Sequence, residues 1–480
     1  MDTPLHTRLD LAPAKRGEGQ QGAVMTTLEE TSAPQRELRA RTFFGEPLGL
    51  AYLAFTEAWE RFSYYGMTAL LVLYMSQALF LPGHVEHVAG FAAFRSGLEA
   101  VFGKMSTLAL ASQVYGLYTG FVYFTPVFGG LIADRFIGRR RAVLLGAVLM
   151  SGGQIAMAFD ASFLVALALL IIGCGLLKGN ISVQVGALYA PDDSAGRTRG
   201  FSIFSMGINV GATTGPLVCG LLAQLYGWHV GFGLAGVLML IGLATYIAGY
   251  RTLTETTPAA NRSHPETKMN AQSWRVVAAL VLVMALTIFE SVAFYQNSNI
   301  GLVWINAHVD LRFFGLQIPV AWFNSINSFV SIVSVPALIA LWKWQGRRGG
   351  EPGDMANIAV GAAIASVANL LLVIGCVAFV RVPVLFPILY NALLGVAFLY
   401  YWPILLALVS RAAPPAIKAT MMGVAFLTLF VSNITLGRLG ALYEVIGPTW
   451  FWALHAAIAA MGAVLALVLA KPLTRMLAVR

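Results

Sequence analysis

The sequence predicts an all-α polytopic membrane protein whose twelve transmembrane helices form two six-helix halves. Hydrophobic residues make up 58% of the 480 residues and charged residues only 11%, whereas a soluble domain carries about 25% charged residues. Apolar stretches that could cross a bilayer, which takes about 20 residues as a helix, recur about twelve times along the chain. A polar segment near the middle separates the first six stretches from the last six.

The expected spans follow from apolar runs bounded by polar or charged residues. Asp160 and its neighbours alone divide the third span from the fourth. In chain order the predicted spans are residues 48–81, 105–133, 141–160, 161–189, 199–224, 229–250, 275–305, 319–344, 355–380, 383–411, 417–442 and 448–470.

The polar segments outside these spans divide the chain into tails, bundles and a linker. The first tail is rich in Gly, Gln, Thr, Pro and charges and has no apolar run of the kind found in a signal peptide. We therefore expect a disordered cytoplasmic tail, an N-terminal six-helix bundle, a cytoplasmic linker, a C-terminal six-helix bundle and a second cytoplasmic tail at residues 1–46, 47–250, 251–273, 274–471 and 472–480 respectively.

The basic residues are distributed as expected for a membrane protein with both termini in the cytoplasm. Loops on the cytoplasmic side of such a protein carry an excess of Lys and Arg, and alternate loops here do so, beginning with Arg139 to Arg141 after the second span. The net charge of +9 therefore reflects topology rather than a surface for nucleic acid. The expected location is the plasma membrane, or the inner membrane in a Gram-negative bacterium.

A short internal repeat agrees with a chain built from two similar halves. Gly138-Arg139-Arg140 follows the second span, and Gly346-Arg347-Arg348 follows the eighth, which is the second span of its half. Two six-helix halves that enclose a site at the membrane midplane are the architecture of the major facilitator fold. The sequence thus predicts that fold.

Three charged residues lie inside the first span, where hydrocarbon is expected. On a helix, Glu57, Glu60 and Arg61 share one face because they are three or four residues apart. A charge at the bilayer centre costs roughly 2.5–3.5 kcal/mol, which favours a water-filled cavity that handles ions or a charged solute. The alternative is a self-neutralising ion pair that only fixes helix packing, although the surplus carboxylate leaves these three residues net negative.

Two further ionisable residues lie at membrane depth, Lys178 in the fourth span and Glu290 in the seventh. A buried ammonium needs a carboxylate, so we expect Lys178 to lie near the surplus glutamate of the first helix. Protonation of that glutamate would free Arg61 or Lys178 to bind an anionic solute. The planar fork of Arg61 suits a carboxylate because it can donate to both oxygens.

Residues 57–66 read EAWERFSYYG and resemble the ExxERFxYYG signature of the proton-coupled oligopeptide transporter (POT) family. Three other segments are similar to segments of that family. They are the GGxxADxxxG turn with Gly130, Asp134, Arg135 and Gly138, the fourth-helix segment from Lys178 to Ser182, and the fifth-helix segment around Asn209. Gln296 and Asn327 are matching positions in the C-terminal half.

The resemblance implies inward symport of di- and tripeptides with protons by alternating access. Arg61 and Lys178 would hold the peptide carboxylate, and Glu57 and Glu60 would carry the proton. The four segments cover the N-terminal half. The other residues that would line the substrate site are Tyr64, Tyr65, Tyr123, Asn209, Gln296 and Asn327, and the cytoplasmic gate motif would be Gly130, Asp134, Arg135 and Gly138.

The C-terminal half departs from the family at the positions that meet the amino terminus of a peptide. The tenth-helix glutamate of the family, aligned on Pro403, is Phe398 here, and no Asp or Glu occurs between Asp354 and Glu444. The seventh-helix acidic position before Gln296 is Phe294 or Tyr295, and the family's eleventh-helix tryptophan and eighth-helix Asn-Pro are replaced at Ala425 and Ser328.

These departures leave two substrate classes open. One is a di- or tripeptide, with Glu290 replacing the missing carboxylates. The other is a non-peptide or N-blocked small organic anion, because an ammonium desolvated without a counter-charge loses several kcal/mol. For either substrate, the alternative role of Glu290 is a separate proton-coupling site beside Glu57 and Glu60.

An enzyme built on the same fold is the third class considered. The spans contain no paired His or Cys ligands for a metal and no Ser-His-Asp set, and Cys174, Cys219 and Cys376 lie in apolar runs without metal-like spacing. We therefore expect a secondary transporter with no metal and no cofactor other than protons as the coupling ion. Its partners would be a small-molecule substrate and the lipid bilayer, not nucleic acid, and it would function as a monomer.

Overall fold

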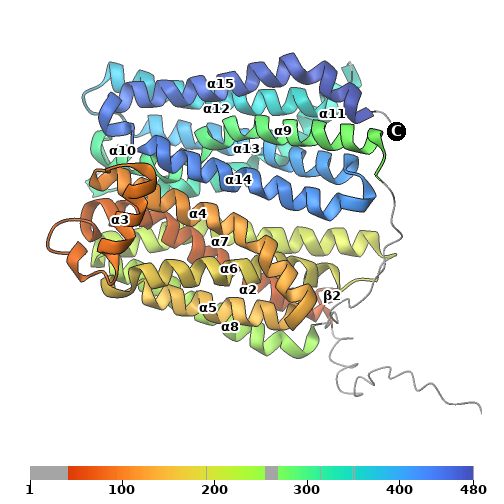
Figure 1. The fold of residues 1–480 in the computed structure, drawn as a ribbon, viewed down its shortest axis with the longest axis horizontal. Coiled ribbons are helices and arrows are strands. Elements are labelled where there is room, and N and C mark those ends of the chain that lie inside the picture. Colours follow the sequence, from red (N-terminus) through yellow and green to blue (C-terminus); the bar gives the residue numbers. More distant parts are fainter. Residues whose placement is uncertain are drawn as a thin grey trace, which may run out of the picture.

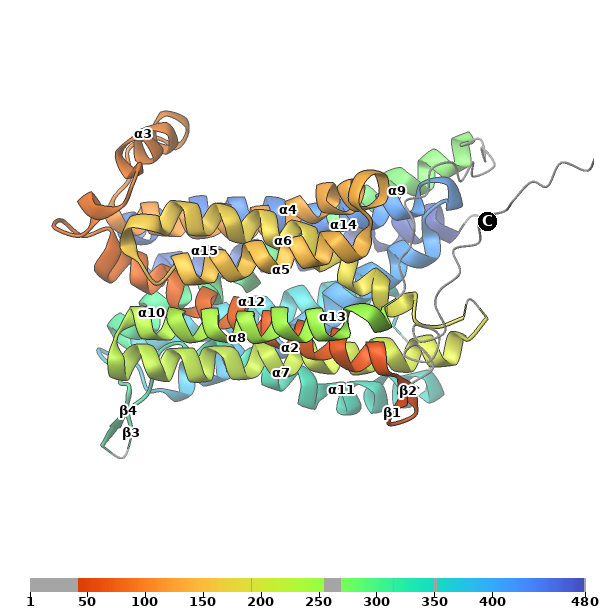
Figure 2. The same cartoon turned by 90° about the horizontal axis from the view of Figure 1, so that it is seen from below.

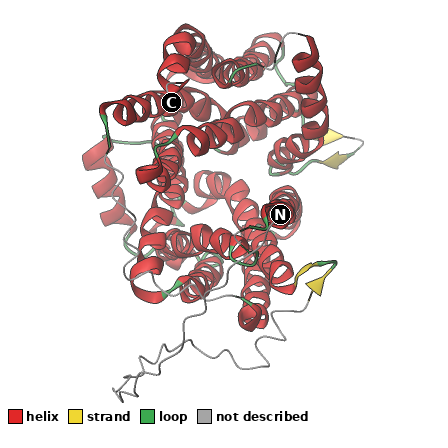
Figure 3. Cartoon of the chain, turned by 90° about the vertical axis from the view of Figure 1, so that its right-hand side faces the viewer, coloured by secondary structure: helices red, strands yellow, loops and turns green. Residues whose placement is uncertain are grey.

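The computed structural model describes residues 42–190, 192–253, 269–313, 315–348, 350 and 352–478. Its long helices run side by side in one bundle (Figure 1) and are seen nearly end-on in Figure 3. The first half contains α2 (Leu48–Tyr74), α4 (Thr107–Ile132), α5 (Arg139–Ala156), α6 (Phe163–Gly186), α7 (Ser194–Tyr226) and α8 (Trp228–Gly249). The second half contains α9 (Ala271–Tyr295), α11 (Trp322–Arg348), α12 (Asp354–Ala378), α13 (Leu385–Ala412), α14 (Lys418–Gly440) and α15 (Tyr443–Ala478).

These twelve long helices coincide with the twelve predicted spans, so the predicted fold class is confirmed. Within the described residues, ten of them are long and apolar enough to cross a membrane. The other two are α2, which contains the three intramembrane charges, and α5, which begins with Arg139, Arg140 and Arg141. Polar residues at these places lower the hydropathy of a helix without preventing it from spanning a bundle.

The shorter elements lie at the two ends of the bundle. The β1–β2 hairpin (Thr42–Phe43 with Glu46–Pro47) precedes α2 at one end, which we call the terminal side. Helix α3 (Phe91–Phe102) and the β3–β4 hairpin (Arg312–Phe313 with Leu316–Gln317) lie at the opposite end, the far side (Figure 2). The remaining short helices are η1 (Met75–Leu79), η2 (Val85–His87), η3 (Ala133–Ile137), η4 (Asp160–Ser162), η5 (Tyr250–Thr252), η6 (Gln296–Ser298), α10 (Ile300–His308) and η7 (Pro415–Ile417).

Several details differ from the expected boundaries. The seventh span is broken, because α9 ends at Tyr295 and α10 begins at Ile300 after Asn299 leaves helical geometry with φ −109° and ψ −108°. Helix α3 was not predicted, and α15 continues through residues 472–478, where a tail was expected. Residues 42–46 of the expected first tail form the β1–β2 hairpin and the connection into it, whereas residues 1–41 and the linker residues 254–268 lie outside the described residues.

Hydrogen bonds between the two halves gather toward the far side, where α4 packs against α14. Ser112 of α4 accepts a hydrogen bond from Asn299 at 2.7 Å, and Thr119 donates to Asn433 of α14 at 2.8 Å. The backbones approach closely, because a Cβ on Gly116 would lie 2.4 Å from the Asn433 carbonyl oxygen. At the same side, Trp322 of α11 donates to the Leu217 carbonyl of α7 at 2.8 Å. The far side is therefore closed by contacts between the halves.

A stripe of glycines on α7 fixes the position of α2 and of its charged residues. Cβ atoms added at Gly207, Gly211 and Gly215 would lie 2.8, 2.4 and 2.4 Å from carbonyl oxygens of α2. Only glycine fits at these distances, and glycines four residues apart are a common means of close helix packing in membranes. The backbone of α2 is thus held against α7, and its charged face is turned toward the centre of the bundle.

Candidate functional site

The three charged residues of α2 form one buried cluster. Glu57, Glu60 and Arg61 are 3%, 0% and 3% exposed. The Arg61 Nε lies 3.1 Å from a Glu57 oxygen and also donates to Glu60. Because a buried charge is stable only when it is paired and hydrogen-bonded, each of these side chains depends on the other two.

The cluster retains hydrogen-bonding capacity that its own members do not use. One oxygen of Glu57, one of Glu60 and Nη2 of Arg61 have no hydrogen-bond partner within the described part of the chain. The Arg61 guanidinium lies 5.3 Å from the centre of the Tyr64 ring, and the Tyr65 hydroxyl is within its reach. One guanidinium nitrogen and two carboxylate oxygens therefore have hydrogen-bonding capacity that the described residues do not use.

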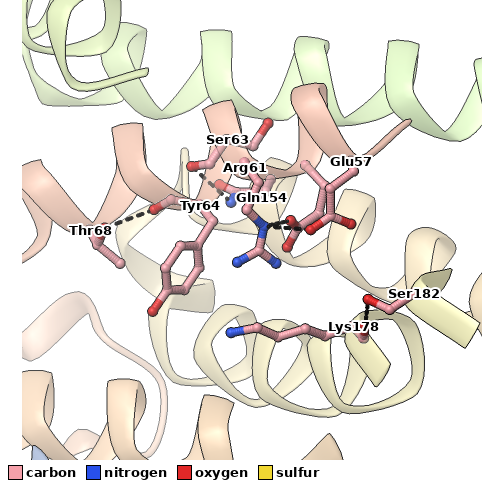
Figure 4. Close-up of polar contacts among 9 residues, drawn as sticks. Glu57, Arg61, Ser63, Tyr64, Thr68, Gln154, Lys178 and Ser182 are labelled. Atoms are coloured by element: carbon pink, nitrogen blue, oxygen red, sulfur yellow. Dashed lines mark hydrogen bonds and ion pairs between the residues drawn. The ribbon is translucent and has the colours of Figure 1, made fainter. Parts of the chain in front are cut away.

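Lys178 reaches this cluster from α6. Its side chain extends beneath α2 toward Arg61 and Tyr64 (Figure 4), and it is close enough to Arg61, Glu57 and Glu60 to interact with their charges. The ammonium lies 4.3 Å from the centre of the Tyr123 ring, a distance typical of a cation–π contact. Two basic and two acidic groups from α2 and α6 thus meet in one place, as the sequence predicted.

A close contact between α4 and α6 positions Lys178. A Cβ on Gly129 would lie 2.0 Å from the Gly175 carbonyl oxygen, and Asn180 of α6 donates to the Gly129 carbonyl at 3.2 Å. Gly130, which the sequence placed in the gate motif, would meet nothing within 4 Å. The glycine that this packing requires is therefore Gly129.

The segment predicted to be the cytoplasmic gate motif forms a turn at the terminal side. Asp134 and Arg135 belong to η3, and Gly138 adopts a φ of 78° immediately before α5, a conformation that favours glycine. The Asp134 carboxylate pairs with Arg139 at 2.9 Å. Arg135 is exposed. The pair of Asp134 and Arg139 thus joins η3, which follows α4, to the start of α5.

The other predicted substrate residues are placed less uniformly. Tyr123 and Asn209 are partly exposed, on α4 and α7. Gln296 is fully buried, and its amide contacts the His455 ring at 3.2 Å and the Leu436 carbonyl at 3.4 Å. It therefore joins the break after α9 to α14 and α15 and is not brought to the charged cluster. Asn327 lies partly exposed on α11, with its backbone against Gly395 of α13.

Glu290 lies inside the C-terminal half, apart from the basic residues. It is 1% exposed, and neither of its oxygens has a hydrogen-bond partner within the described ranges. A Cβ on Gly361 of α12 would lie 2.8 Å from one Glu290 oxygen and 3.1 Å from the Ala397 carbonyl of α13. The carboxyl group thus occupies a space between α9, α12 and α13 that a larger residue at position 361 would fill.

Aromatic residues occupy the positions at which the family has carboxylates. The Phe294 ring of α9 lies 5.6 Å from Phe398 and 6.4 Å from Tyr401 of α13, and Tyr295 faces Tyr123 across the two halves at 6.4 Å. Tyr401 and Tyr295 were not predicted as functional. Their signal in the sequence was weak, because aromatic residues in apolar helices are usually core residues.

The fold is that of a major facilitator transporter, and the charged cluster is built from α2 and α6 of its first half. Among the described residues, no group of three or more His, Cys, Asp or Glu side chains could hold a metal ion. A sequence model of the POT family matches residues 140–274 and 257–448. The chain belongs to the POT family, and it is therefore a secondary transporter and not an enzyme.

Curated relatives are similar over most of their length. An uncharacterized transporter, YclF of Bacillus subtilis, is 28% identical over 85% of this chain and 91% of its own. The peptide transporter YePEPT of Yersinia enterocolitica is 28% identical over 83% and 88%. The di-/tripeptide transporter of Lactococcus lactis subsp. cremoris is 27% identical over 91% and 98%.

Solved structures show the same architecture. The crystal structure of a peptide transporter POT in complex with sulfate superposes with a TM-score of 0.80, at 27% identity, and covers 92% of this chain and 99% of that one. A mutant of a peptide transporter POT in complex with alafosfalin gives a TM-score of 0.81 at 27% identity, over 93% and 99%.

Proposed function

We propose that this protein is a proton-coupled symporter that imports di- and tripeptides by alternating access. Arg61 and Lys178 hold the substrate carboxylate, and Glu57 and Glu60 carry the proton. The observation that supports this best is the meeting of Arg61 with two buried carboxylates and, from another helix, with Lys178. Peptides are favoured because two of the similar curated relatives are named peptide or di-/tripeptide transporters.

Coupling follows from competition for Arg61. While Glu57 and Glu60 are both ionised, they occupy the Nε of Arg61, and a solute carboxylate meets two like charges. When one glutamate takes a proton, its attraction for the guanidinium falls and the local charge becomes less negative. Arg61 and Lys178 can then accept a carboxylate, so the protonated site binds the anion more tightly than the unprotonated one.

The closed side indicates which compartment the site faces in this conformation. The halves are joined at the far side, which we assign to the outside of the cell, with the terminal side in the cytoplasm, in accord with the basic loops. In this conformation the substrate would be exchanged with the cytoplasm. The protein would act as a monomer in the plasma membrane, or in the inner membrane of a Gram-negative cell.

A second candidate substrate is a small organic anion whose amine is blocked or absent. The specific observation in its favour is that Phe294, Phe398 and Tyr401 pack together where a peptide ammonium would need a carboxylate. Proton coupling and the roles of Arg61 and Lys178 are the same for both substrates.

The test uses purified protein in liposomes with an inward proton gradient. Labelled dialanine and labelled N-acetyl-alanine are offered separately, and we expect concentrative uptake of dialanine that stops when the gradient is collapsed. Accumulation of N-acetyl-alanine alone would move the assignment to the second candidate, and equal uptake with and without a gradient would contradict proton coupling.

Glu57→Gln tests the proton site within the same assay. The variant cannot change its charge, so we expect gradient-driven accumulation to be lost while exchange between two substrate-filled sides persists. Glu99→Gln, on α3 at the far side, is the control for loss of a carboxylate elsewhere in the same half. Full concentrative uptake by Glu57→Gln would exclude Glu57 as a coupling site.

A further inference from the structure

Arg197, in the first turn of α7, is a basic residue that the proposed carboxylate site does not use. Among the residues that the structure describes, its buried Nε has no hydrogen-bond partner and no acidic side chain forms an ion pair with it. Other arginines at the terminal side each have an acidic partner. They are Arg139, Arg199 and Arg411. Because a buried charged donor is stable only when another group accepts from it, the position of Arg197 favours an anion as its partner.

Two carboxylates near the start of α7 are bonded to other groups. Asp193 caps the helix and accepts a hydrogen bond from the Gly196 N–H at 2.8 Å. Glu46 accepts from Arg199 at 2.7 Å. These acids of the chain are therefore engaged elsewhere, and the anion that suits Arg197 is one that comes from outside the described residues.

Arg197 lines a cavity between the end of α6 and the start of α7. The volume of the cavity is about 450 Å³, within the range of roughly 300–1,000 Å³ that small-molecule sites span. Its other described lining residues are small, apolar or hydroxylated. They are Ser182, Val183, Gly186, Ala187 and Phe201. Within the described part of the chain, the cavity thus offers one positive charge and no acidic group.

The cavity continues the face of α6 that carries Lys178. Ser182 follows Lys178 by four residues, so the two side chains share a face and lie about 6 Å apart along the helix axis. They occupy neighbouring turns (Figure 4), and the Ser182 hydroxyl donates to the Lys178 carbonyl at 3.4 Å. Because α6 runs from the far side to the terminal side, the cavity lies on the terminal side of the charged cluster.

The walls of the cavity suit the carboxylate end of a small solute. The guanidinium of Arg197 can donate to both oxygens of a carboxylate, and the Ser182 hydroxyl can turn to donate to one of them. Val183 and Phe201 are 41% and 37% exposed and offer apolar contact to the rest of the solute. An ammonium group would find no counter-charge among the described lining residues.

We propose that Arg197 and Ser182 form a second carboxylate-binding site, which receives the solute after it leaves Arg61 and Lys178 and before it reaches the cytoplasm. This inference rests on the proposed function and extends it from binding to release. At the first site the solute carboxylate faces two cations, and direct release into water loses both at once. A cation further along the same face of α6 lets the carboxylate exchange one basic partner for the next, which favours release toward the terminal side.

The test is protection of a cysteine introduced into the cavity of the purified protein in detergent. Ala187→Cys is reacted with a small maleimide, and the wild type gives the background from its three native cysteines. The probe is N-acetyl-alanine, whose carboxylate is its only charge. We expect it to slow the labelling of Ala187→Cys several-fold, whereas the uncharged N-acetyl-alanine amide should not.

Further substitutions in the Ala187→Cys protein identify the group that holds the probe. Arg197→Gln should abolish the protection. Arg199→Gln removes an arginine that already pairs with Glu46 and should leave the protection unchanged. Arg61→Lys weakens the first site and should also leave it unchanged. If Arg197→Gln does not fold, the comparison of N-acetyl-alanine with its amide still decides.

Three results would overturn the inference. Labelling that N-acetyl-alanine does not slow, or slows equally in Arg197→Gln, would exclude a carboxylate from this cavity. Protection that disappears in Arg61→Lys would mean that the probe acts through the first site. Protection by phosphatidylglycerol in place of N-acetyl-alanine would assign Arg197 to a lipid headgroup. Failure of the wild type to accumulate dialanine would instead count against the proposed function, because the labelling requires neither transport nor a proton gradient.

Discussion

The N-terminal half brings Glu57, Glu60, Arg61 and Lys178 together near its centre, whereas the C-terminal half places one carboxyl group, Glu290, among apolar and aromatic side chains. In the first half the charges are paired, so each can remain ionised at low dielectric. In the second half no described residue pairs with the acid, an environment that favours the neutral form over the carboxylate. The comparison teaches that the same residue type, glutamate, can pair with a cation in one half and lie unpaired among apolar side chains in the other, according to which residues pack beside it.

Removal of Arg61 should have the largest effect on stability and on substrate binding. Its positive charge is what distinguishes the paired glutamates of the N-terminal half from Glu290, with which no described residue pairs. Arg61→Ala leaves Glu57 and Glu60 without their buried partner, and breaking such a pair typically costs about 3–5 kcal/mol. We expect a lower temperature of thermal unfolding and no detectable binding of dialanine. Arg61→Lys keeps the charge but not the planar fork and should bind weakly.

Arg95→Ala is the control for loss of an arginine, because Arg95 is 43% exposed on α3 and pairs with Glu99. It should retain stability and binding. Normal dialanine affinity in Arg61→Ala would contradict the carboxylate-binding role of the N-terminal half.

Phe294, Phe398 and Tyr401 form a cluster that we call the aromatic wall. A carboxylate introduced there should give the C-terminal half a charged group that can bind substrate, as the N-terminal half has. In Phe398→Glu, the new carboxylate would pair with the ammonium group of a peptide whose carboxylate is bound by Arg61. A hydrogen bond to a charged group contributes about 1.5–3 kcal/mol. We expect the preference for dialanine over N-acetyl-alanine to rise by about tenfold or more, since about 1.4 kcal/mol is a factor of ten. The measurement is competition for uptake in liposomes.

Phe398→Gln, of similar size but without charge, is the matched variant and should change the preference little. An unchanged preference in a folded Phe398→Glu protein would show that the aromatic wall does not face the amine end of the substrate.

Two variants at the contact between α4 and α6 should distinguish a glycine that positions Lys178 from the glycine next to it. Gly129→Ala would place a Cβ 2.0 Å from the Gly175 carbonyl oxygen, whereas Gly130→Ala would meet nothing within 4 Å. Forcing an additional methyl group into close packing typically costs about 1–3 kcal/mol. We expect Gly129→Ala to lower both thermal stability and uptake, because Lys178 moves with α6.

Gly130→Ala should behave like the wild type in both measurements. Equal stability and uptake in the two variants would mean that the position of Lys178 does not depend on this contact.

The smallest effect is expected for an ion pair at the surface of the N-terminal half. Glu46 accepts from Arg199 at 2.7 Å and from Tyr189 at 2.9 Å, and the hydrogen bond from Arg199 holds the pKa of Glu46 below its ordinary value of 4.5. The ionised form is therefore favoured in the folded state. Its contribution is complete above pH 4.5 and is lost as the pH falls through the lowered pKa.

Thermal unfolding of the wild type and Arg199→Ala at neutral pH and at pH below 4.5 tests the direction of this pH dependence. The two proteins should differ slightly at neutral pH and converge in acid. A difference that grows in acid would contradict it. Because Arg199 is 60% exposed, the difference should remain small.

The sequence predicted most of the fold for a direct physical reason. A bilayer requires about 20 apolar residues per helix, so twelve such runs indicated twelve spans, and all twelve long helices are found. It missed α3 and the break between α9 and α10, which lie at the ends of spans, where no such length requirement acts.

The sequence by itself also determined the charged cluster, because helical spacing places Glu57, Glu60 and Arg61 on one face wherever that face points. Only the tertiary structure decided what surrounds each acid. Packing against α12 and α13 leaves Glu290 without a hydrogen-bond partner among the described residues, whereas Gln296 contacts His455. The charge state of a side chain in a membrane interior depends on neighbours from segments far apart in the sequence. Spacing along a single helix does not specify those neighbours.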